Sequence, residues 1–376
     1  MPLPFRHHHL LEFFSLYEES TKPVDYLLSL YFKEHRALGS KDRRDIGDML
    51  YGILRWKGLL DALSDKQTWE ERLRIWEEVD PLSYINDTSL PLHVRCSFPQ
   101  NLFDRLVAAY GEEEAKKLCL ACNMPAPVTV RVNPLKIDRD SLLLRWREQD
   151  YPVEPCAQAS LGIRFAQKMA FSSMEEFRQG LFEIQDEGSQ LVAGLVDAKP
   201  GDKILDYCAG AGGKTLAFAP FMANKGQIYL HDIRPWILQE AKKRLRKAGI
   251  QNAQFVPPED KILRMIRGHM DVVLVDVPCS GTGTLRRNPD MKWKYSDEML
   301  ERLIEQQYDI AAEALSYLKP KGRLIYATCS ILPEENEKQI AKLCDAFDLE
   351  MISPAFHSLP EEGEMDGFYG VQLRKR

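Results

Sequence analysis

The chain has 376 residues, of which 44% are hydrophobic and 28% charged, and its formal net charge is −6. This length can supply cores for two or three domains. No apolar run reaches the roughly 18 residues of a transmembrane helix, and the N-terminus lacks the apolar core of a signal peptide. With eight scattered cysteines, the chain is expected to be a cytoplasmic protein with no membrane association, and its net charge confines nucleic-acid binding to local patches.

Helical periodicity dominates residues 1–90, which we expect to form a helical domain. Apolar residues recur at helix spacing in two stretches, Leu10, Phe13, Phe14 and Tyr17, and then Ile46, Leu50, Ile53 and Leu54. The segment Gly39-Ser40-Lys41-Asp42 predicts a loop with an N-cap before the second stretch. The proline-containing segment Asp80–Pro99 is the predicted domain boundary.

Residues 97–183 show a mixed pattern. Helices are predicted within Leu102–Asn123, at Ser141–Gln149 and at Met174–Gly180, and strands at Val128–Val132 and Gly162–Phe165. This pattern predicts a small α+β module of the kind that often holds RNA.

From residue 184 to 376, strand and helix patterns alternate. Strands are predicted to begin at Ile204, Gln227, Ala253, Asp271 and Arg323, and helices cover Trp236–Lys247 and Asp297–Leu318. Such alternation predicts an α/β domain with a Rossmann-like, doubly wound parallel sheet covered on both faces.

A glycine-rich turn, LDYCAGAGGKT, joins the first of these strands to a helix at Leu205–Thr215. A P-loop is disfavoured, because Cys208 stands where that motif needs a glycine. Asp232, at the end of the second strand, is placed to hold ribose hydroxyls. The turn and the acid fit both a nicotinamide dinucleotide and S-adenosylmethionine.

Two cysteines, Cys279 and Cys329, each come just after an apolar strand. Ligands of such sheets bind beyond the carboxyl ends of the strands, so both thiols could face one substrate. Covalent attack on a pyrimidine, with a second group to release the product, uses two thiols. Elsewhere we expect no metal site: Cys119 and Cys122 lack a partner pair at zinc spacing, and the tract His7–His9 is interpreted as solvated.

Several motifs together resemble the RsmB/Sun-type RNA cytosine-5 methyltransferases. They are QDEGSQL (185–191), LDYCAGAGGKT, DVVLVDVPCSGTG followed by RRNPDMKW, YATCSILPEENE and DGFYGVQLRK (366–375). Upstream, SFPQNLF and VTVRVNP are similar to the family's RNA-binding segment, and DRRDIGDMLYGILRW (42–56) is similar to part of a NusB-like helical domain.

The resemblance implies roles for particular residues. Cys329 would be the nucleophile that adds to cytosine C6, Cys279 would assist release, and Asp276 would bind the base near N3. S-adenosylmethionine would be held by Cys208, Ala209, Gly210, Ala211, Gly212, Gly213, Lys214, Asp232, Asp260 and Asp276. Arg287, Asp290 and Lys292 would contact RNA phosphate or the flipped base; the alternative is a surface turn with ordinary ion pairs.

This chain departs from the family pattern at three places. It has Gly210-Ala211 for Ala-Pro, Arg234 for a second acid, and Glu259-Asp260 for Gly-Asp. The first change frees the backbone of the cofactor loop. We expect a monomer that methylates ribosomal RNA, with transfer RNA as the alternative substrate. The alternative from a different functional class is a non-catalytic RNA-binding assembly factor, and the intact cysteines and acids disfavour it.

Overall fold

The computed structural model describes residues 4–375 and separates into two compact units. The first contains the described residues up to Pro125 together with Thr284–Asp297. The second contains Ala126–Gly283 and the described chain from Glu298 onward. This division differs from the predicted domains 1–90 and 97–183, because the helices at 100–123 cluster with the helices before them. One tie is the Asn123 side chain, which donates to the Cys96 carbonyl at 2.7 Å.

The first unit is helical, as predicted. Its elements are α1 (Phe5–Glu18), α2 (Val24–Glu34), α3 (Ser40–Ala62), α4 (Trp69–Glu78), the short 3₁₀ helix η1 (Pro81–Tyr84), α5 (Leu92–Arg95), α6 (Gln100–Tyr110), α7 (Glu112–Asn123) and α14 (Met291–Lys294). The predicted apolar stripes of α1 and α3 share one core, in which Phe13 and Leu50 are fully buried. The cap of α3 differs from prediction: Gly39 is the N-cap without a side-chain hydrogen bond, and Asp42 instead pairs with Arg6 at 2.7 Å.

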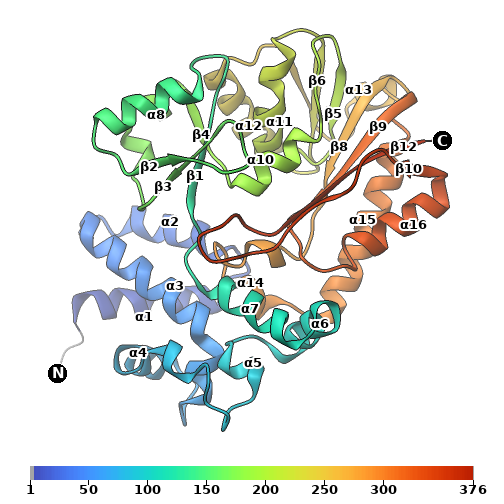
Figure 1. Cartoon of the computed structure of the whole chain (residues 1–376). Coiled ribbons are helices and arrows are strands. Elements are labelled where there is room, and N and C mark those ends of the chain that lie inside the picture. Colours follow the sequence, from blue (N-terminus) through green and yellow to red (C-terminus); the bar gives the residue numbers. More distant parts are fainter. Residues whose placement is uncertain (1–3, 376) are drawn as a thin grey trace. The chain divides into compact units, whose positions relative to one another are not determined.

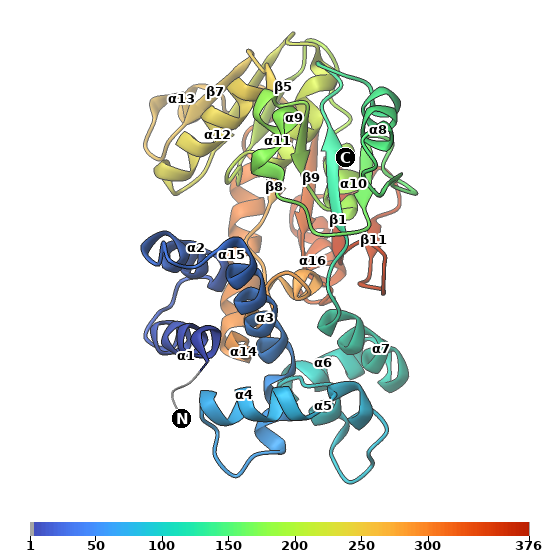
Figure 2. The ribbon, with the colours of Figure 1, turned by 90° about the vertical axis from the view of Figure 1, so that its left-hand side faces the viewer.

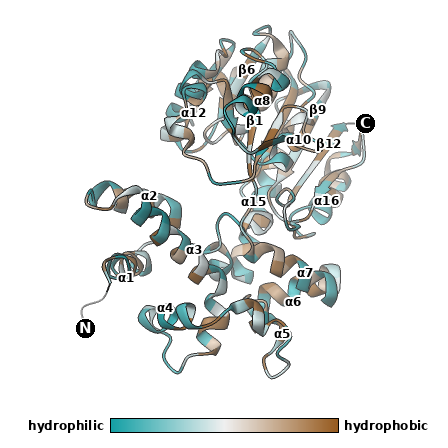
Figure 3. Cartoon of the chain, turned by 60° about the vertical axis from the view of Figure 1, so that its left-hand side comes forward, coloured by the Kyte–Doolittle hydropathy of each residue, from teal (hydrophilic) through white to brown (hydrophobic). Residues whose placement is uncertain are grey.

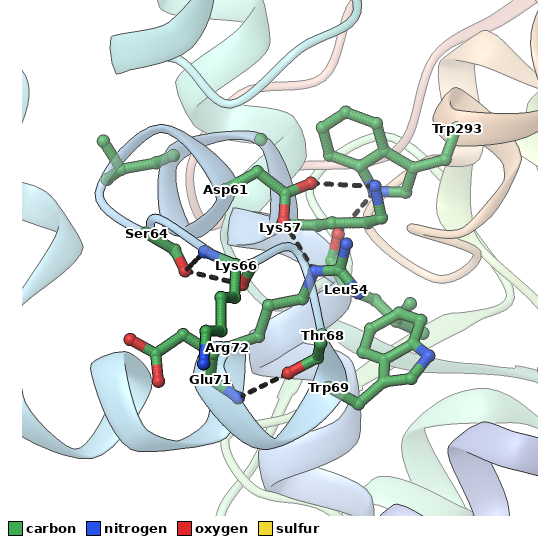
Figure 4. A network of polar contacts seen from close by, with 12 residues as sticks. Leu54, Lys57, Asp61, Ser64, Lys66, Thr68, Trp69, Glu71, Arg72 and Trp293 are labelled. Carbon is green, nitrogen blue, oxygen red and sulfur yellow. Dashed lines mark hydrogen bonds and ion pairs between the residues drawn. The ribbon is translucent and has the colours of Figure 1, made fainter.

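The segment Thr284–Asp297 is bound into this helical unit by its own side chains. Figure 4 shows Trp293 beside the C-terminal half of α3, where its indole nitrogen donates to the Leu54 carbonyl at 2.6 Å. The ammonium of Lys57 lies 5.1 Å from the centroid of the Trp293 ring. Asp61 joins Lys57 to Arg72 of α4 at 3.0 and 2.6 Å, so one carboxylate connects two helices beneath the tryptophan.

The second unit begins with a small antiparallel sheet of strand order β2-β3-β1-β4. Its elements are β1 (Val128–Val132), α8 (Arg139–Glu148), β2 (Val153–Pro155), β3 (Gly162–Phe165), η2 (Phe171–Ser173), α9 (Glu175–Gln179) and β4 (Phe182–Ile184). Trp146 of α8 is fully buried against Phe165 and Phe182 of the sheet, at centroid distances of 5.0 and 5.1 Å. The helix and sheet appear together in Figures 1 and 2.

The rest of the second unit is a predominantly parallel α/β sheet of order β10-β12-β9-β8-β5-β6-β7, with β11 paired to β12. Its strands are β5 (Lys203–Asp206), β6 (Gln227–His231), β7 (Ala253–Val256), β8 (Met270–Asp276), β9 (Leu318–Thr328), β10 (Leu349–Met351), β11 (Phe356–Ser358) and β12 (Phe368–Lys375). Its helices are α10 (Glu187–Gly194), α11 (Gly213–Phe218), η3 (Ala219–Met222), α12 (Pro235–Ala248), α13 (Lys261–Met265), η4 (Thr282–Thr284), α15 (Asp297–Leu315) and α16 (Glu337–Phe347). Strands β5 to β9 pair in parallel, and β12 is antiparallel to β9.

Alternation along β8 explains why helices cover both faces of this sheet. Val272 and Leu274 belong to one apolar cluster with α11 and α12, whereas Val273 and Val275 belong to another with α15 and α16. Successive side chains of a strand point to opposite faces, so a wholly apolar strand must be buried on both sides. Figure 3 shows the hydrophobic colour on strands of this sheet as well as on parts of the helices. The predicted doubly wound fold is confirmed. Within residues 4–375, no helix is both long and apolar enough to cross a membrane.

Candidate active site

The site lies at the carboxyl ends of β5, β6 and β8, around a cavity of about 830 Å³ in the second unit. Most of the predicted cofactor residues line it: Cys208, Ala209, Gly210, Ala211, Gly213, Lys214, Asp232 and Asp276. Parallel strands place their carboxyl ends at one edge, which is why Cys208, Asp232 and Asp276 meet there although they are far apart in the chain. Gly212 and Asp260 lie outside this lining.

Gly212 does not line the cavity, but the fold requires a glycine at this position. Its φ is +76°, a left-handed conformation that favours glycine, and a Cβ there would lie 2.9 Å from Leu245 of α12. Gly210 also has positive φ, +51°, but a Cβ there would meet no other described side chain or backbone atom within 4 Å. The cofactor loop is therefore tight against α12 at Gly212 and open at Gly210.

Asp232, at the end of β6, is only 4% exposed and already has partners. Its carboxylate accepts a hydrogen bond from the Gly210 N–H at 2.9 Å and a bidentate contact from Arg234 at 2.9 and 3.1 Å. Burial by itself raises the pKa of Asp232, but the Arg234 hydrogen bonds outweigh it and the pKa is lowered. Because Arg234 stands where the family pattern often has an acid, any ligand hydroxyl that reaches this carboxylate must compete with a guanidinium for it.

Asp206, at the end of β5, lines the same cavity and was missed in the sequence analysis. One carboxylate oxygen accepts from the Thr215 hydroxyl at 2.6 Å, while the other is buried without a hydrogen-bond partner among the described residues. Burial raises the pKa of Asp206 to about 7. A buried, unpartnered acceptor in a cavity is a site for a donor from a ligand. Asp206 lies within the LDYCAGAGGKT motif, so the sequence did contain a signal that could have identified it.

Two arginines hold the cofactor loop and were also missed. Arg244 of α12 donates to the Ala211 carbonyl at 2.8 Å and pairs with Glu183 at 2.9 Å. Arg131 of β1, which is 5% exposed, donates to the Gly213 carbonyl at 3.3 Å. The small sheet therefore contacts the cofactor loop directly, and it orders a loop that lacks the proline of the family pattern.

The two predicted thiols meet at the ends of the adjacent strands β8 and β9. The Cys279 and Cys329 sulfur atoms are 3.4 Å apart, and both side chains are half-buried. Beside them, the Lys214 ammonium forms a short ion pair with Asp276. The thiol pair and the ion pair thus bring together residues from α11, β8 and the loops that follow β8 and β9.

The electrostatics distinguish the two thiols. The hydrogen bond from the Cys279 thiol lowers the pKa of Cys329, and the Lys214 charge acts in the same direction against burial, Asp276 and Glu335. The same hydrogen bond, together with burial, holds the pKa of Cys279 well above its usual range. Burial alone lowers the pKa of Lys214, but the Asp276 charge and hydrogen bond outweigh it, so the pKa is raised. The site favours a thiolate at Cys329 and a neutral thiol at Cys279.

The remaining predicted residues lie elsewhere. Asp260 caps α13, where its carboxylate accepts the Ile262 N–H at 3.0 Å. Asp290 and Lys292 are 2% and 1% exposed and belong to the helical unit, and Arg287 is half-buried there. Such burial does not support the predicted RNA contacts of Asp290 and Lys292.

Three side chains of the helical unit gather atoms of metal-ligating type. Those of His9, Glu12 and His35 lie within 4.8 Å of one another. The Tyr31 hydroxyl occupies the space between them, 2.7 Å from His9 Nδ1 and 2.6 Å from the Glu12 carboxylate. A hydrogen-bond network accounts for this arrangement, and His9 is buried in it, not solvated as predicted.

Comparison with known proteins places the chain among RNA-modifying enzymes. Residues 193–374 match the family "16S rRNA methyltransferase RsmB/F", and residues 98–172 match its ferredoxin-like domain. A ribosomal RNA small subunit methyltransferase B of Photorhabdus laumondii is 31% identical over 333 residues, covering 85% of this chain and 73% of that protein. A probable ribosomal RNA small subunit methyltransferase B of Bacillus subtilis is 34% identical over 334 residues, covering 80% and 71%. The chain belongs to the RsmB/F methyltransferase family.

A solved structure agrees with this membership of the RsmB/F family. A methyltransferase homolog from Pyrococcus horikoshii is 27% identical, with a TM-score of 0.67 over 79% of this chain and 99% of that one. The ferredoxin-like match at 98–172 overlaps the small sheet of the second unit, so the predicted α+β module corresponds to a known part of the RsmB/F architecture.

Proposed function

We propose that this RsmB/F protein transfers a methyl group from S-adenosylmethionine to C5 of a cytosine in ribosomal RNA, through a covalent adduct with Cys329. The observation that carries the proposal is the thiol pair, with 3.4 Å between sulfurs, at the ends of β8 and β9. An RNA-binding assembly factor has no use for a thiolate held in this way.

The cavity suits S-adenosylmethionine, which supplies an electrophilic methyl group when bound. The unpartnered Asp206 oxygen would accept from its ammonium group, and Asp232 would accept from the ribose once Arg234 yields. A Cβ at Gly210 would meet no other described side chain or backbone atom within 4 Å, so the loop leaves space for the ligand at this position. Of the acids that line the cavity, Asp232 and Asp276 are paired with Arg234 and Lys214. Asp206 is therefore the acid best placed to meet the positive ammonium group of the ligand.

The thiols would divide the reaction into steps. The Cys329 thiolate adds to C6 of cytosine, and the electron pair of the 5,6 double bond makes C5 nucleophilic. As the thiolate adds, N3 of the base takes a proton from solvent. The Asp276 carboxylate, which Lys214 holds in place, would accept a hydrogen bond from that N3–H. After C5 has taken the methyl group, a base removes the C5 proton, the double bond re-forms and the C6–sulfur bond breaks. Cys279 assists this release.

The test separates the two thiols on a denaturing gel with RNA and S-adenosylmethionine. Cys329→Ala should form no adduct and no product. Cys279→Ala should still attack, although more slowly because Cys329 loses the thiol that lowers its pKa, and it should accumulate as a protein–RNA adduct. Cys344→Ala, a thiol on α16 outside the site, is the matched control and should behave as wild type.

Two results would contradict the proposal. An adduct from Cys329→Ala but not from Cys279→Ala would mean that the roles are reversed. Full methylation by both variants, with no adduct, would remove covalent catalysis. Bisulfite sequencing of cellular RNA with and without the gene identifies the modified cytosine and decides between ribosomal and transfer RNA.

A further inference from the structure

We propose that Glu335 is a positioning residue whose carboxylate joins the loops that carry Cys279 and Cys329 and thereby sets the contact between the two thiols. The inference rests on the proposed function for the importance of that contact. Glu335 lies in the PEENE segment before α16 and is fully buried.

Each carboxylate oxygen of Glu335 accepts two hydrogen bonds. One accepts from the Ser280 backbone N–H and from the Gln307 side chain, both at 2.8 Å. The other accepts from the hydroxyls of Ser280 and Ser330 through short hydrogen bonds. A buried carboxylate is tolerated when its lone pairs are used in this way.

Two of the three donor residues are the immediate neighbours of the two thiols in the chain. Ser280 follows Cys279, and Ser330 follows Cys329, so one rigid, planar group bonds to both loops, which are 50 residues apart in the chain. Gln307 of α15 also donates to the Pro278 carbonyl at 3.0 Å. The loop is therefore held on both sides of Cys279, and Glu335 anchors each of these contacts.

The charge of Glu335 does not itself activate the nucleophile. It opposes formation of the thiolate, because a nearby negative charge raises the pKa of Cys329. The hydrogen bond from Cys279 is the larger influence and lowers that pKa. A buried charge that acts against the thiolate but fixes the geometry of the hydrogen bond has a positional role.

Alkylation of Cys329 by iodoacetamide tests this role without RNA or cofactor. The rate is followed against pH by mass spectrometry of the Cys329 peptide in the full-length protein. In Glu335→Ala the thiol contact is lost, the apparent pKa of Cys329 should rise by about one unit, and the rate at pH 7 should fall roughly tenfold.

Two further variants separate position from charge. Glu335→Gln keeps a carbonyl for Ser280 N–H and Gln307 and offers an amide to the hydroxyls, so its rate should equal or exceed that of wild type. Glu334→Ala is the matched control: its side chain is 24% exposed and pairs with Lys338 at 3.1 Å, and no change is expected. Faster or unchanged alkylation in Glu335→Ala would overturn the proposal.

A milder change covers the outcome that Glu335→Ala does not fold. Ser330→Ala removes the hydrogen bond from the Cys329 loop to Glu335, together with the contacts of that hydroxyl with Ser280 and Thr282, and leaves the Ser280 and Gln307 bonds to Glu335 in place. It should also slow alkylation; a wild-type profile in a folded protein would overturn the proposal. Because the readout uses no RNA, a wild-type enzyme that fails to methylate RNA would refute the proposed function without altering this result. Where methylation is measured, Glu335→Ala should lower kcat with an unchanged Kd for S-adenosylmethionine.

Discussion

Lys292 gives a prediction that separates a buried structural lysine from an RNA-binding one. Its ammonium donates to the Arg55 carbonyl at 2.7 Å and to the Asn123 side chain at 2.6 Å, and it lies 4.4 Å from the centroid of the Phe98 ring. Despite these partners, burial lowers the pKa of Lys292 to about 7. The folded state therefore loses this proton at a pH where the unfolded chain keeps it.

The direction of the pH dependence follows from proton linkage. Below pH 7, Lys292 is charged in both states, so it adds no pH dependence. Between pH 7 and the lysine reference pKa of about 10.4, the unfolded state binds more protons, and stability rises with pH. One proton corresponds to about 1.4 kcal/mol per pH unit, and the whole interval to about 5 kcal/mol.

The assay compares wild type with Lys292→Met, which cannot titrate. The comparison is needed because burial raises the pKa of Cys96 to about 11 and that of Cys119 well above its usual value, so both thiols lower stability as pH rises above about 8.5. Urea unfolding at pH 7, 8, 9 and 10, followed by tryptophan fluorescence, gives each free energy of unfolding. The difference between wild type and variant should move in favour of wild type by about 4 kcal/mol from pH 7 to 10.

A difference that stays constant from pH 7 to 10 would refute this reasoning. It would mean that Lys292 has an ordinary lysine pKa, as an exposed RNA contact would. RNA affinity in varied salt is the complementary measurement, since loss of a phosphate contact reduces the salt dependence by about one counterion.

Three further predictions concern the cofactor loop. Arg234→Gln should tighten S-adenosylmethionine binding about twofold to fivefold in calorimetry, because a partly exposed ion pair worth about 0.5–1 kcal/mol no longer competes for Asp232; weaker binding would show that Arg234 itself holds the ligand. Arg244→Ala should weaken binding about tenfold, because the Ala211 carbonyl loses a charged donor, and unchanged affinity would make that bond incidental. Since Asp206 has a pKa of about 7, affinity should rise as pH increases from 5.5 to 7 and its carboxylate ionises, and Asp206→Asn should abolish the rise; a variant with the wild-type pH profile would exclude Asp206 as the titrating group.

The sequence predicted elements well where local patterns determine them. Strands β1 and β3 begin and end where expected, and Gly180 ends α9 in the left-handed conformation with φ +73°. The helix predicted to reach Leu318 stops at Leu315, because β9 recruits the following residues into the sheet. The last strand, β12, was present only as a motif. It pairs with β9, about 45 residues earlier, and a pairing between segments so far apart has no local signature in the sequence.

The candidate site was predicted in part for the same reason. Cys279, Cys329, Asp232 and the loop near Gly210 lie at strand ends, and strand ends in a parallel sheet share an edge. The groups that hold them in place act over distance: Arg131 and Gly213 are 82 residues apart, and Ser280 and Glu335 are 55 apart. Contacts between residues so far apart leave no periodic pattern in the sequence, so the roles of Arg131 and Glu335 could not be predicted from it.

The segment Thr284–Asp297 follows the proposed catalytic Cys279 closely in sequence but belongs to the helical unit. The chain leaves the catalytic unit at Gly283, four residues after Cys279, and returns at Glu298. Gly283 leaves no room for a side chain, since a Cβ there would lie 2.1 Å from the Gly367 carbonyl oxygen, and its N–H donates to the Cys329 carbonyl at 2.9 Å. The loop is thus fixed at the last residue of the second unit before this segment, and Lys292 beyond it serves the core of the helical unit. Burial in the core of the helical unit, and not the distance in sequence from Cys279, determines what Asp290 and Lys292 contact.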